Sequence, residues 1–386
     1  MAPMIAFTAD SLFTPTTTVA GPVLIVEDGT IVRLESRDGM DLPSGVDLVP
    51  FKNCTIAPGF IDIHIHGSAG YDVMQADRST RSHFEHFLAR HGVTSYCPTT
   101  VTAPLDTTLS ALERLADAVE SADGSGGSRP LGIHLEGPFL SHARRGVHST
   151  QDLLPPTVAM FDKFWQAARG HIRVMTIAPE LDGATEVITE STRRGVCVSI
   201  GHSDATLEFA RRGVAAGARH ATHTFNAMRQ LDHRDPGILG EVLTNQHLTA
   251  DVIADGFHVA PTVIGLLFKA KGPENIVLIT DAISAAGMPD GRYKLGLLEV
   301  DVQGGKCVMD GRIAGSALIM DRAIQNVMNF AKCDLQQALR AATANPARVV
   351  GAQKKGVLEI GADADFVVLT AEGQVRATAI KGALLQ

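Results

Sequence analysis

The 386-residue chain has few cysteines and no long apolar segment. Its five cysteines, at positions 54, 97, 197, 307 and 333, are scattered and never spaced as Cys-x-x-Cys. This spacing argues against a disulfide framework and against a cysteine zinc site. No apolar run approaches the roughly 20 residues that cross a bilayer, and the first seven residues lack the basic and apolar regions of a signal peptide. We therefore expect a soluble cytoplasmic protein with reduced thiols.

Basic charge is also scarce. The formal net charge is −8, and the basic clusters are only pairs, such as Arg144-Arg145 and Arg211-Arg212. This charge argues against a general nucleic-acid binder. With 45% hydrophobic residues, the chain has ample material for a large core.

From residue 58 to about 350, short apolar strands alternate with amphipathic helical stretches, for example at residues 81–90, 108–115 and 206–212. Such alternation predicts parallel β/α units, and eight of them form a (β/α)8 barrel. The predicted strands lie near residues 60–66, 93–100, 130–136, 172–179, 196–202, 219–225, 248–254 and 275–281.

The two ends of the chain differ from this middle part. Residues 1–57 and 351–386 contain short β segments with turn signals, such as Asp28-Gly29. Neither end is long enough to bury a core alone. We predict that they combine into one small β-sandwich domain, beside a barrel domain at 58–350.

Polar residues fall at the ends of five predicted strands, where a β/α barrel builds its active site. An isolated His-x-His motif is more often an ordinary strand with satisfied histidines. Agreement among five strand ends instead favours a metal site. The residues are His64 and His66 after the first strand, His134 and Glu136 after the third, His202 and Asp204 after the fifth, His223 and Asn226 after the sixth, and Asp281 after the eighth.

These residue types indicate a reaction. Imidazoles with a carboxylate bind Zn²⁺ or Fe²⁺ and leave a position for water, whose pKa the ion lowers toward about 7. Asp281 is then a candidate general base for that water and acid for a leaving amine. The alternatives are an N-cap or a further metal ligand, although no evident helix follows Asp281. Hydrolysis of an amide or amine is the predicted reaction class.

The chain also resembles a known family. The segments PGFIDIHIHG (58–67), HLEGPF (134–139), GHSDA (201–205), THTFNAM (222–228), ADGFH (254–258) and TDA (280–282) are similar to the amidohydrolase superfamily, specifically the N-acetylglucosamine-6-phosphate deacetylases. The most specific element is HLEGPF followed by Gly146-Val147-His148, and the resemblance runs along almost the whole chain. A glutamate stands where many superfamily members have a carboxylated lysine, which is typical of the deacetylases.

The resemblance implies roles for the polar residues. Glu136, His202 and His223 match the principal metal ligands of the family, Asp281 its base, and His148 the residue that polarises the acetyl carbonyl. Some members replace the first-strand histidines with amides and use one ion. Because this chain retains both, we predict one or two ions per subunit, Zn²⁺ first, with unequal affinity. His64 and His66 are the expected ligands of the second ion.

A second set of positions matches the substrate site of the family. Arg234 and His258 match phosphate and hydroxyl contacts, and in the family the arginine reaches the neighbouring subunit, which implies a homodimer. Beside Asp232 and Asp235, Arg234 also fits a plain surface residue. The remaining matches are Val147, Asn226 and Ala227, which line the sugar, and Ile313, Ala314 and Gly315 in a loop that closes on the ligand.

The implied activity is metal-dependent hydrolysis of N-acetyl-D-glucosamine 6-phosphate to D-glucosamine 6-phosphate and acetate, in amino-sugar metabolism. Three alternatives stay open: a deacetylase of the galactosamine isomer, another amidohydrolase acting on a cyclic amide or amine, and a catalytically silent binding protein. The motif HLEGP and Arg234 disfavour the second, and the intact polar set disfavours the third. Gluco or galacto specificity depends on loop geometry that the sequence does not reveal.

Overall fold

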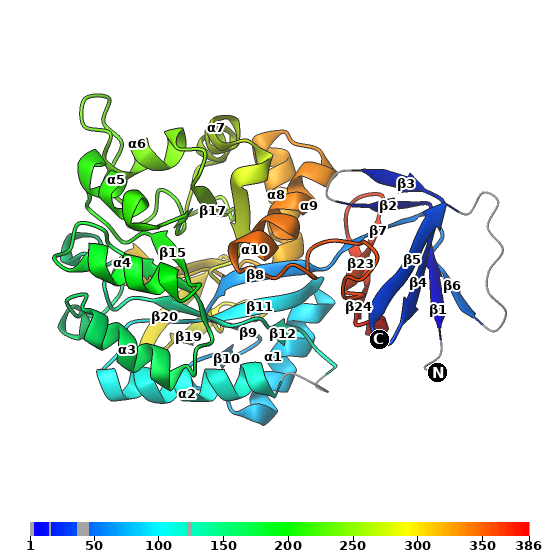
Figure 1. Ribbon diagram of the computed structural model, residues 1–386, viewed down its shortest axis with the longest axis horizontal. Helices are drawn as coiled ribbons and strands as arrows, with labels where there is room; N and C mark the ends of the chain where they lie inside the picture. Colours follow the sequence, from blue (N-terminus) through cyan, green and yellow to red (C-terminus); the bar gives the residue numbers. More distant parts are fainter. Residues whose placement is uncertain (1–3, 15–16, 37–45, 122–125, 386) are drawn as a thin grey trace.

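The computed structural model describes residues 4–14, 17–36, 46–121 and 126–385, with only the backbone of Arg78. Its centre is a barrel of eight parallel strands (Figure 1). Each strand overlaps one predicted from the sequence, which confirms the barrel. The strands are β8 (Phe60–Ile65), β11 (Val93–Thr100), β13 (Ile133–Glu136), β14 (Ile172–Ile177), β15 (Cys197–Ile200), β16 (His220–Ala221), β17 (Thr249–Ile253) and β18 (Ile276–Ile279).

The predicted strand at 130–136 is divided. Its first part, β12 (Arg129–Pro130), pairs with Ser95 and Tyr96 on β11, and its second part, β13, pairs with Thr99 and Thr100 farther along the same strand. β8 occupies the other edge of β11. The break therefore leaves the order of the barrel unchanged.

The barrel closes where the segment after β18 meets the end of β8. The backbone N–H of Asp281 donates to the carbonyl of His64 at 2.9 Å, and that of His66 donates to the carbonyl of Ala282 at 2.8 Å. Ile65 and Ala282 form a parallel bridge. This seam brings Asp281 beside the first-strand histidines, although more than 200 residues separate them in the sequence.

Helices surround the barrel (Figure 1). Asp77 caps the N-terminus of α1 and forms a reciprocal capping box with Thr80, and α2 buries Leu112 and Leu115 on its inner face. No helix in the described ranges is long and apolar enough to span a membrane. The helices are α1 (Arg78–Arg90), α2 (Leu105–Glu120), α3 (Val158–Ala167), α4 (Ala184–Arg193), α5 (Leu207–Ala216), α6 (Gly237–Thr244), α7 (Pro261–Lys271), α8 (Met320–Ala331), α9 (Leu335–Ala342) and α10 (Ala344–Val349).

The two ends of the chain form β-rich sheets beside the barrel (Figure 1). One sheet has the order β5-β4-β1-β6, and the other has the order β25-β24-β23-β7-β2-β3. Phe7 and Phe366, from opposite ends of the chain, meet edge to face in their shared core with ring centres 4.8 Å apart. Neither end supplies this core alone. The strands are β1 (Ile5–Thr8), β2 (Ser11–Phe13), β3 (Thr18–Ala20), β4 (Pro22–Glu27), β5 (Thr30–Ser36), β6 (Asp47–Pro50), β7 (Cys54–Pro58), β23 (Phe366–Thr370), β24 (Val375–Ile380) and β25 (Ala383–Leu385).

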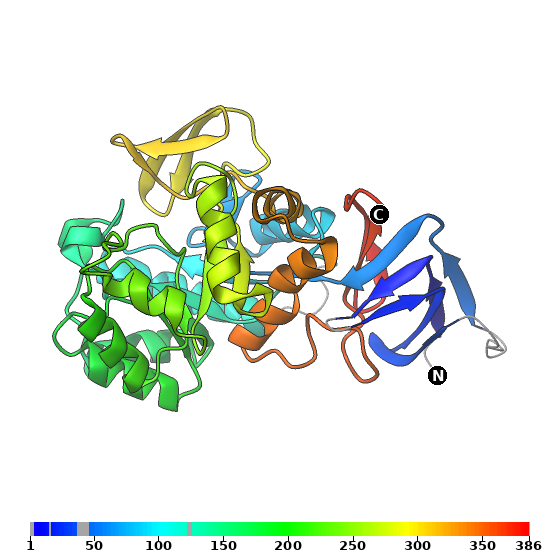
Figure 2. The same cartoon turned by 90° about the horizontal axis from the view of Figure 1, so that it is seen from above.

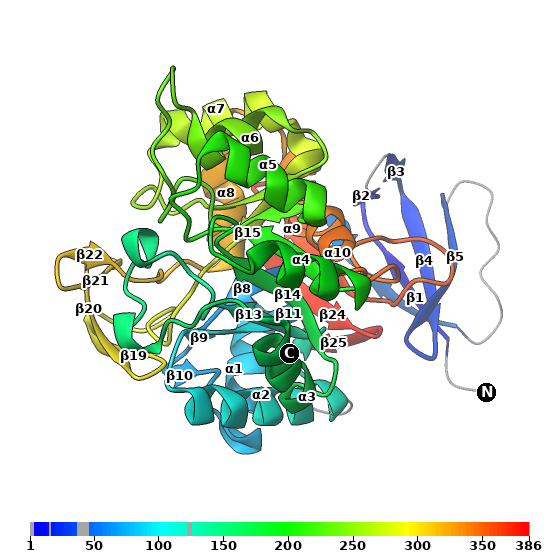
Figure 3. The same ribbon diagram turned by 60° about the vertical axis from the view of Figure 1, so that its left-hand side comes forward.

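One feature was not predicted from the sequence. After β18, a small antiparallel sheet projects from the barrel (Figure 2), on the side away from the terminal sheets (Figure 3). We call this sheet, residues 291–313, the rim sheet. It consists of β19 (Gly291–Leu295), β20 (Leu298–Gln303), β21 (Lys306–Met309) and β22 (Arg312–Ile313).

Candidate active site

A cavity of about 330 Å³ opens at the carboxyl ends of the barrel strands. This is the end at which β/α barrels build their active sites. The cavity combines imidazole and carboxylate side chains with loop residues of the predicted substrate set. Its lining consists of His66, Val101, Glu136, Gly146, Val147, His148, His202, His223, Asn226, Ala227, His258, Asp281, Leu295, Ile313 and Gly315.

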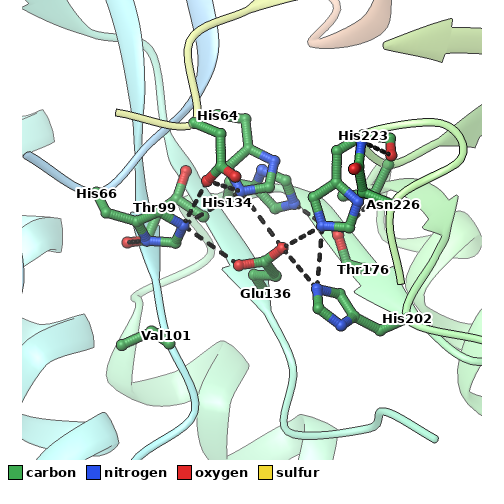
Figure 4. Close-up of polar contacts among 12 residues, drawn as sticks. His64, His66, Thr99, Val101, His134, Glu136, Thr176, His202, His223 and Asn226 are labelled. Carbon is green, nitrogen blue, oxygen red and sulfur yellow. Dashed lines mark hydrogen bonds and ion pairs between the residues drawn. The ribbon is translucent and has the colours of Figure 1, made fainter. Parts of the chain in front are cut away.

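Glu136, at the end of β13, lies at the centre of the polar cluster (Figure 4). Its Oε1 atom is 3.1 Å from Nε2 of His223 and 3.3 Å from Nε2 of His202. Its Oε2 atom is 3.3 Å from Nε2 of His66. One carboxylate thus faces histidines on two sides, as a carboxylate that bridges two ions does.

Asp281 and the first-strand histidines form the second part of the cluster. His64 is completely buried, and its Nε2 is 3.4 Å from Glu136 Oε1 and 3.4 Å from Asp281 Oδ1. The Nε2 of His66 is 3.1 Å from Asp281 Oδ1. The ligand atoms of His64, His66 and Asp281 all lie within 4.8 Å of one another, as do those of Glu136, His148 and His202. Each set is compact enough to hold an ion.

The backbone turns sharply where several of these residues leave their strands. His202, His223 and Asp281 have positive φ angles of 47°, 28° and 49°. A non-glycine residue in such a conformation costs about 1–3 kcal/mol and persists only where its surroundings hold it. Hydrogen bonds supply part of that support, since Nδ1 of His202 bonds the carbonyl of Arg144 at 2.9 Å. Strain of this kind clusters at functional sites.

Electrostatic interactions with neighbouring histidines keep the two buried carboxylates of the cluster ionised. Burial raises the pKa of the Asp281 carboxyl, but His64 and His66 outweigh it and lower this pKa to about 2. Burial also opposes ionisation of Glu136, yet its histidine neighbours, His64 first, hold its pKa well below the usual range. Both carboxylates are therefore ionised at neutral pH, which suits a metal ligand and a general base.

His134 has a different place from its neighbours in the motif. Its Nδ1 bonds the carbonyl of Ile63 at 3.0 Å, and its Nε2 bonds the Thr176 hydroxyl at 2.8 Å. Burial, followed by the charge of His64, lowers its pKa well below the usual value, so the ring is neutral. With both nitrogens engaged, His134 supports the ring of His64, whose centre is 4.5 Å away. It has no nitrogen to offer an ion.

The structure brings most predicted substrate residues to the cavity. Val147, Asn226, Ala227, His258, Ile313 and Gly315 line it, together with His148. Ala314 is buried behind this wall, and its N–H donates to the carbonyl of Cys307 at 3.2 Å. Arg234 is exposed on the loop before α6 and does not line the cavity of its own chain.

Three lining residues were missed in the sequence. Val101 follows the second barrel strand, an end without any imidazole or carboxylate, so it carried no chemical signal. Gly146 has a φ of 62°, and a Cβ atom there would lie 3.3 Å from the ring of His202. Leu295 belongs to the unpredicted rim sheet. Gly146 alone had a recognisable signal, since it directly precedes Val147.

Comparison with known proteins places this geometry in a family. The model of the amidohydrolase family matches residues 55–385. N-acetylglucosamine-6-phosphate deacetylase of Bos taurus is 41% identical over 345 residues, covering 86% of this chain and 83% of that protein. N-acetylgalactosamine-6-phosphate deacetylase of Escherichia coli is 36% identical over 363 residues, covering 94% of each.

A solved structure agrees with these sequences. It is an alanine variant of N-acetyl-D-glucosamine-6-phosphate deacetylase from Mycobacterium smegmatis in complex with N-acetyl-D-glucosamine-6-phosphate. It superposes with a TM-score of 0.92 at 33% identity and covers 99% of both chains. The likeness therefore includes the barrel, the terminal sheets and the rim sheet together.

Proposed function

Because the chain belongs to the amidohydrolase family and, within it, to the N-acetylglucosamine-6-phosphate deacetylases, we propose that it hydrolyses the N-acetyl group of N-acetyl-D-glucosamine 6-phosphate. The products are D-glucosamine 6-phosphate and acetate. The observation that carries this proposal is the convergence of Glu136, Asp281 and the surrounding histidines on one rim cavity. We further propose that the reaction takes place in the cytoplasm.

The donor set fits a metal ion. Buried imidazoles whose Nε2 atoms face a carboxylate are the ligands of Zn²⁺, and Fe²⁺ accepts the same set. We assign the principal ion to Glu136, His202 and His223, and a second ion to His64 and His66, with Glu136 shared. When bound, the ion supplies a water of lowered pKa and polarises the acetyl carbonyl.

Residues of the chain perform the remaining work. Asp281 removes a proton from the attacking water and returns it to the sugar nitrogen as the C–N bond breaks. His148 donates a hydrogen bond to the acetyl oxygen as negative charge develops there. Asn226, Ala227 and His258 contact the sugar, and the loop at 313–315 covers it.

Among the described residues, the cavity offers no cationic side chain for the phosphate of the proposed substrate. No lysine or arginine lines the cavity in the described part of the chain, although a phosphate is best held by a fork of N–H donors. We therefore propose a homodimer in which Arg234 of each subunit reaches the phosphate site of the other. Arg234→Ala should raise KM about 10–100-fold for the phosphorylated sugar and leave the unphosphorylated sugar unaffected. An equal effect on both sugars would contradict this role.

Acetate release tests the proposed reaction. Zinc-loaded protein is incubated with N-acetylglucosamine 6-phosphate, N-acetylgalactosamine 6-phosphate and unphosphorylated N-acetylglucosamine. We expect the highest kcat/KM for the first. Release from none of the three would overturn the proposal.

The galactosamine isomer is a second candidate substrate. It is favoured by the relative from Escherichia coli, which matches this chain over nearly its whole length. The two sugars differ only in the configuration at C4, so the same catalytic residues serve both. A higher kcat/KM for the galactosamine isomer would select this alternative and retain the deacetylation chemistry.

A further inference from the structure

Five histidines surround Glu136, and three of them, His66, His202 and His148, lie at similar distances from it. The Nε2 atoms of His66, His202 and His148 lie 3.3, 3.3 and 3.6 Å from an oxygen of Glu136. The rings of His148 and His202 are adjacent, with centres 4.7 Å apart. Distance to the carboxylate therefore does not separate a metal ligand from a residue with another task.

The hydrogen-bond partner of the second ring nitrogen, Nδ1, distinguishes a metal ligand from a histidine with another role. Nδ1 of His66 lies 3.0 Å from the carbonyl of Thr99, and Nδ1 of His202 lies 2.9 Å from the carbonyl of Arg144. A carbonyl only accepts hydrogen bonds, so each Nδ1 carries the proton and donates it. The lone pair of each neutral ring is then on Nε2, where an ion binds.

His148 faces the opposite kind of group. Its Nδ1 lies 3.3 Å from the backbone N–H of Thr102 and 2.8 Å from the Thr102 hydroxyl. A backbone N–H only donates, so this Nδ1 must accept. The proton of the neutral ring is then on Nε2, which faces the cavity without a lone pair for a metal.

We infer that Thr102 is a positioning residue that holds His148 with its proton on Nε2, as a hydrogen-bond donor toward the substrate and not as a third histidine ligand. The inference deepens the proposed function, because it explains how His148 comes to donate to the acetyl oxygen. The adjacent rings of His148 and His202 therefore have different roles, because Nδ1 of one faces a backbone N–H and Nδ1 of the other faces a backbone carbonyl.

The packing around Thr102 involves the motif that carries Glu136. Gly137, the next residue, has a φ of 79°, and a Cβ atom there would lie 2.4 Å from the Thr102 hydroxyl oxygen. Glycine relieves both constraints. The glycine of HLEGPF therefore makes room for the residue that orients His148, which links the metal ligand and the proton donor through one contact.

Substitution of Thr102 tests the positioning role. Thr102→Val keeps the shape and the backbone N–H but removes the hydroxyl, so we expect kcat to fall about 10-fold with KM nearly unchanged. Thr102→Ser should restore kcat. An unchanged kcat in Thr102→Val would overturn the role of the hydroxyl.

Thr100→Val is the matched control. Thr100 is equally buried, two residues upstream, and its hydroxyl has no hydrogen-bond partner among the described residues. The same chemical change there should leave kcat, KM and metal content unaltered. A similar loss in both variants would point to packing alone and would contradict the inference.

The proton position is measurable without substrate. In zinc-loaded, ¹⁵N-histidine-labelled protein, the His148 signals are those that disappear in His148→Ala. We expect an unprotonated Nδ1 and a protonated Nε2. A protonated Nδ1 would overturn the inference even if deacetylation is confirmed, and the expected tautomer would stand even if the substrate differs.

Metal content supplies an independent readout. His148→Ala should retain the zinc content of the unsubstituted protein, while His202→Ala, which removes a ring whose Nε2 carries the lone pair, should lose zinc. Loss of zinc in both variants would show that His148 is a ligand.

Discussion

Glu136 separates two groups of side chains that are chemically alike but electrostatically different. On one side, burial lowers the pKa of His66, but Asp281 and Glu136 more than compensate and raise it to about 10. On the other side, burial dominates at His202 and lowers its pKa to about 4. In the metal-free protein at pH 7, the ring of His66 is therefore protonated and the ring of His202 is neutral.

The unequal protonation of His66 and His202 predicts which ion binds more tightly. An ion binds neutral imidazole, so the proton that His66 holds at pH 7 competes with the ion. On the His202 side, burial opposes but Glu136 raises the pKa of His223 to about 9, while His202 is already neutral and needs to lose no proton. The site of Glu136, His202 and His223 should therefore fill first, and that of His64 and His66 second.

Removal of the shared carboxylate should have the largest effect. Glu136→Gln keeps the shape but removes the charge that both sides share, so we expect loss of both ions and a fall in kcat/KM of about 10⁴-fold or more. Metal analysis and acetate release measure the two effects. A variant that still binds two ions would contradict the bridging arrangement.

Asp281→Asn tests the base alone. The amide cannot accept the proton, so we expect kcat to fall about 10³-fold. The principal ion should remain, because none of its ligands has changed. Retained activity would contradict the assigned role, and loss of all metal would show that Asp281 acts chiefly as a ligand.

His66→Asn tests the second metal site separately from the first. We expect the second ion to be lost, the first to remain and kcat to fall about 10-fold. Asparagine preserves polarity, so folding should be little affected. If the unsubstituted protein, purified without chelator, never holds more than one ion, the second site does not exist.

The smallest expected effect is on the stability of the metal-free protein. The folded pKa values of His66 and His223, about 10 and 9, exceed the ordinary histidine value of 6.5. The stabilisation of the folded state by these two histidines is therefore complete below pH 6.5 and is lost as the pH rises through 9 to 10. Tm of the chelator-treated protein should fall by about 5 °C over this window. His66→Asn should show a smaller fall, and a flat profile in both would contradict these shifts.

Much of the fold was predictable because its signals are local. Alternating apolar strands and amphipathic helices mark the eight barrel units, and side-chain periodicity places the polar residues at their ends. The rim sheet was missed because its strands are short and follow a segment whose pattern looked like a continuing loop. Val101, Thr102 and Leu295 were missed for a related reason. The role of each in the site depends on which residue it contacts in the folded protein, and its residue type alone does not predict that contact.

The sequence alone determined the chemistry at the rim, because imidazoles and carboxylates at strand ends converge in any closed β/α barrel. The different roles of these side chains depend on contacts that exist only in the folded chain. The seam between β8 and the segment after β18 places Asp281 against His66. A carbonyl lies behind His202 and an N–H lies behind His148. A carbonyl only accepts and an N–H only donates. The tautomer of each ring is therefore set by a peptide group that is distant in sequence but lies beside its Nδ1.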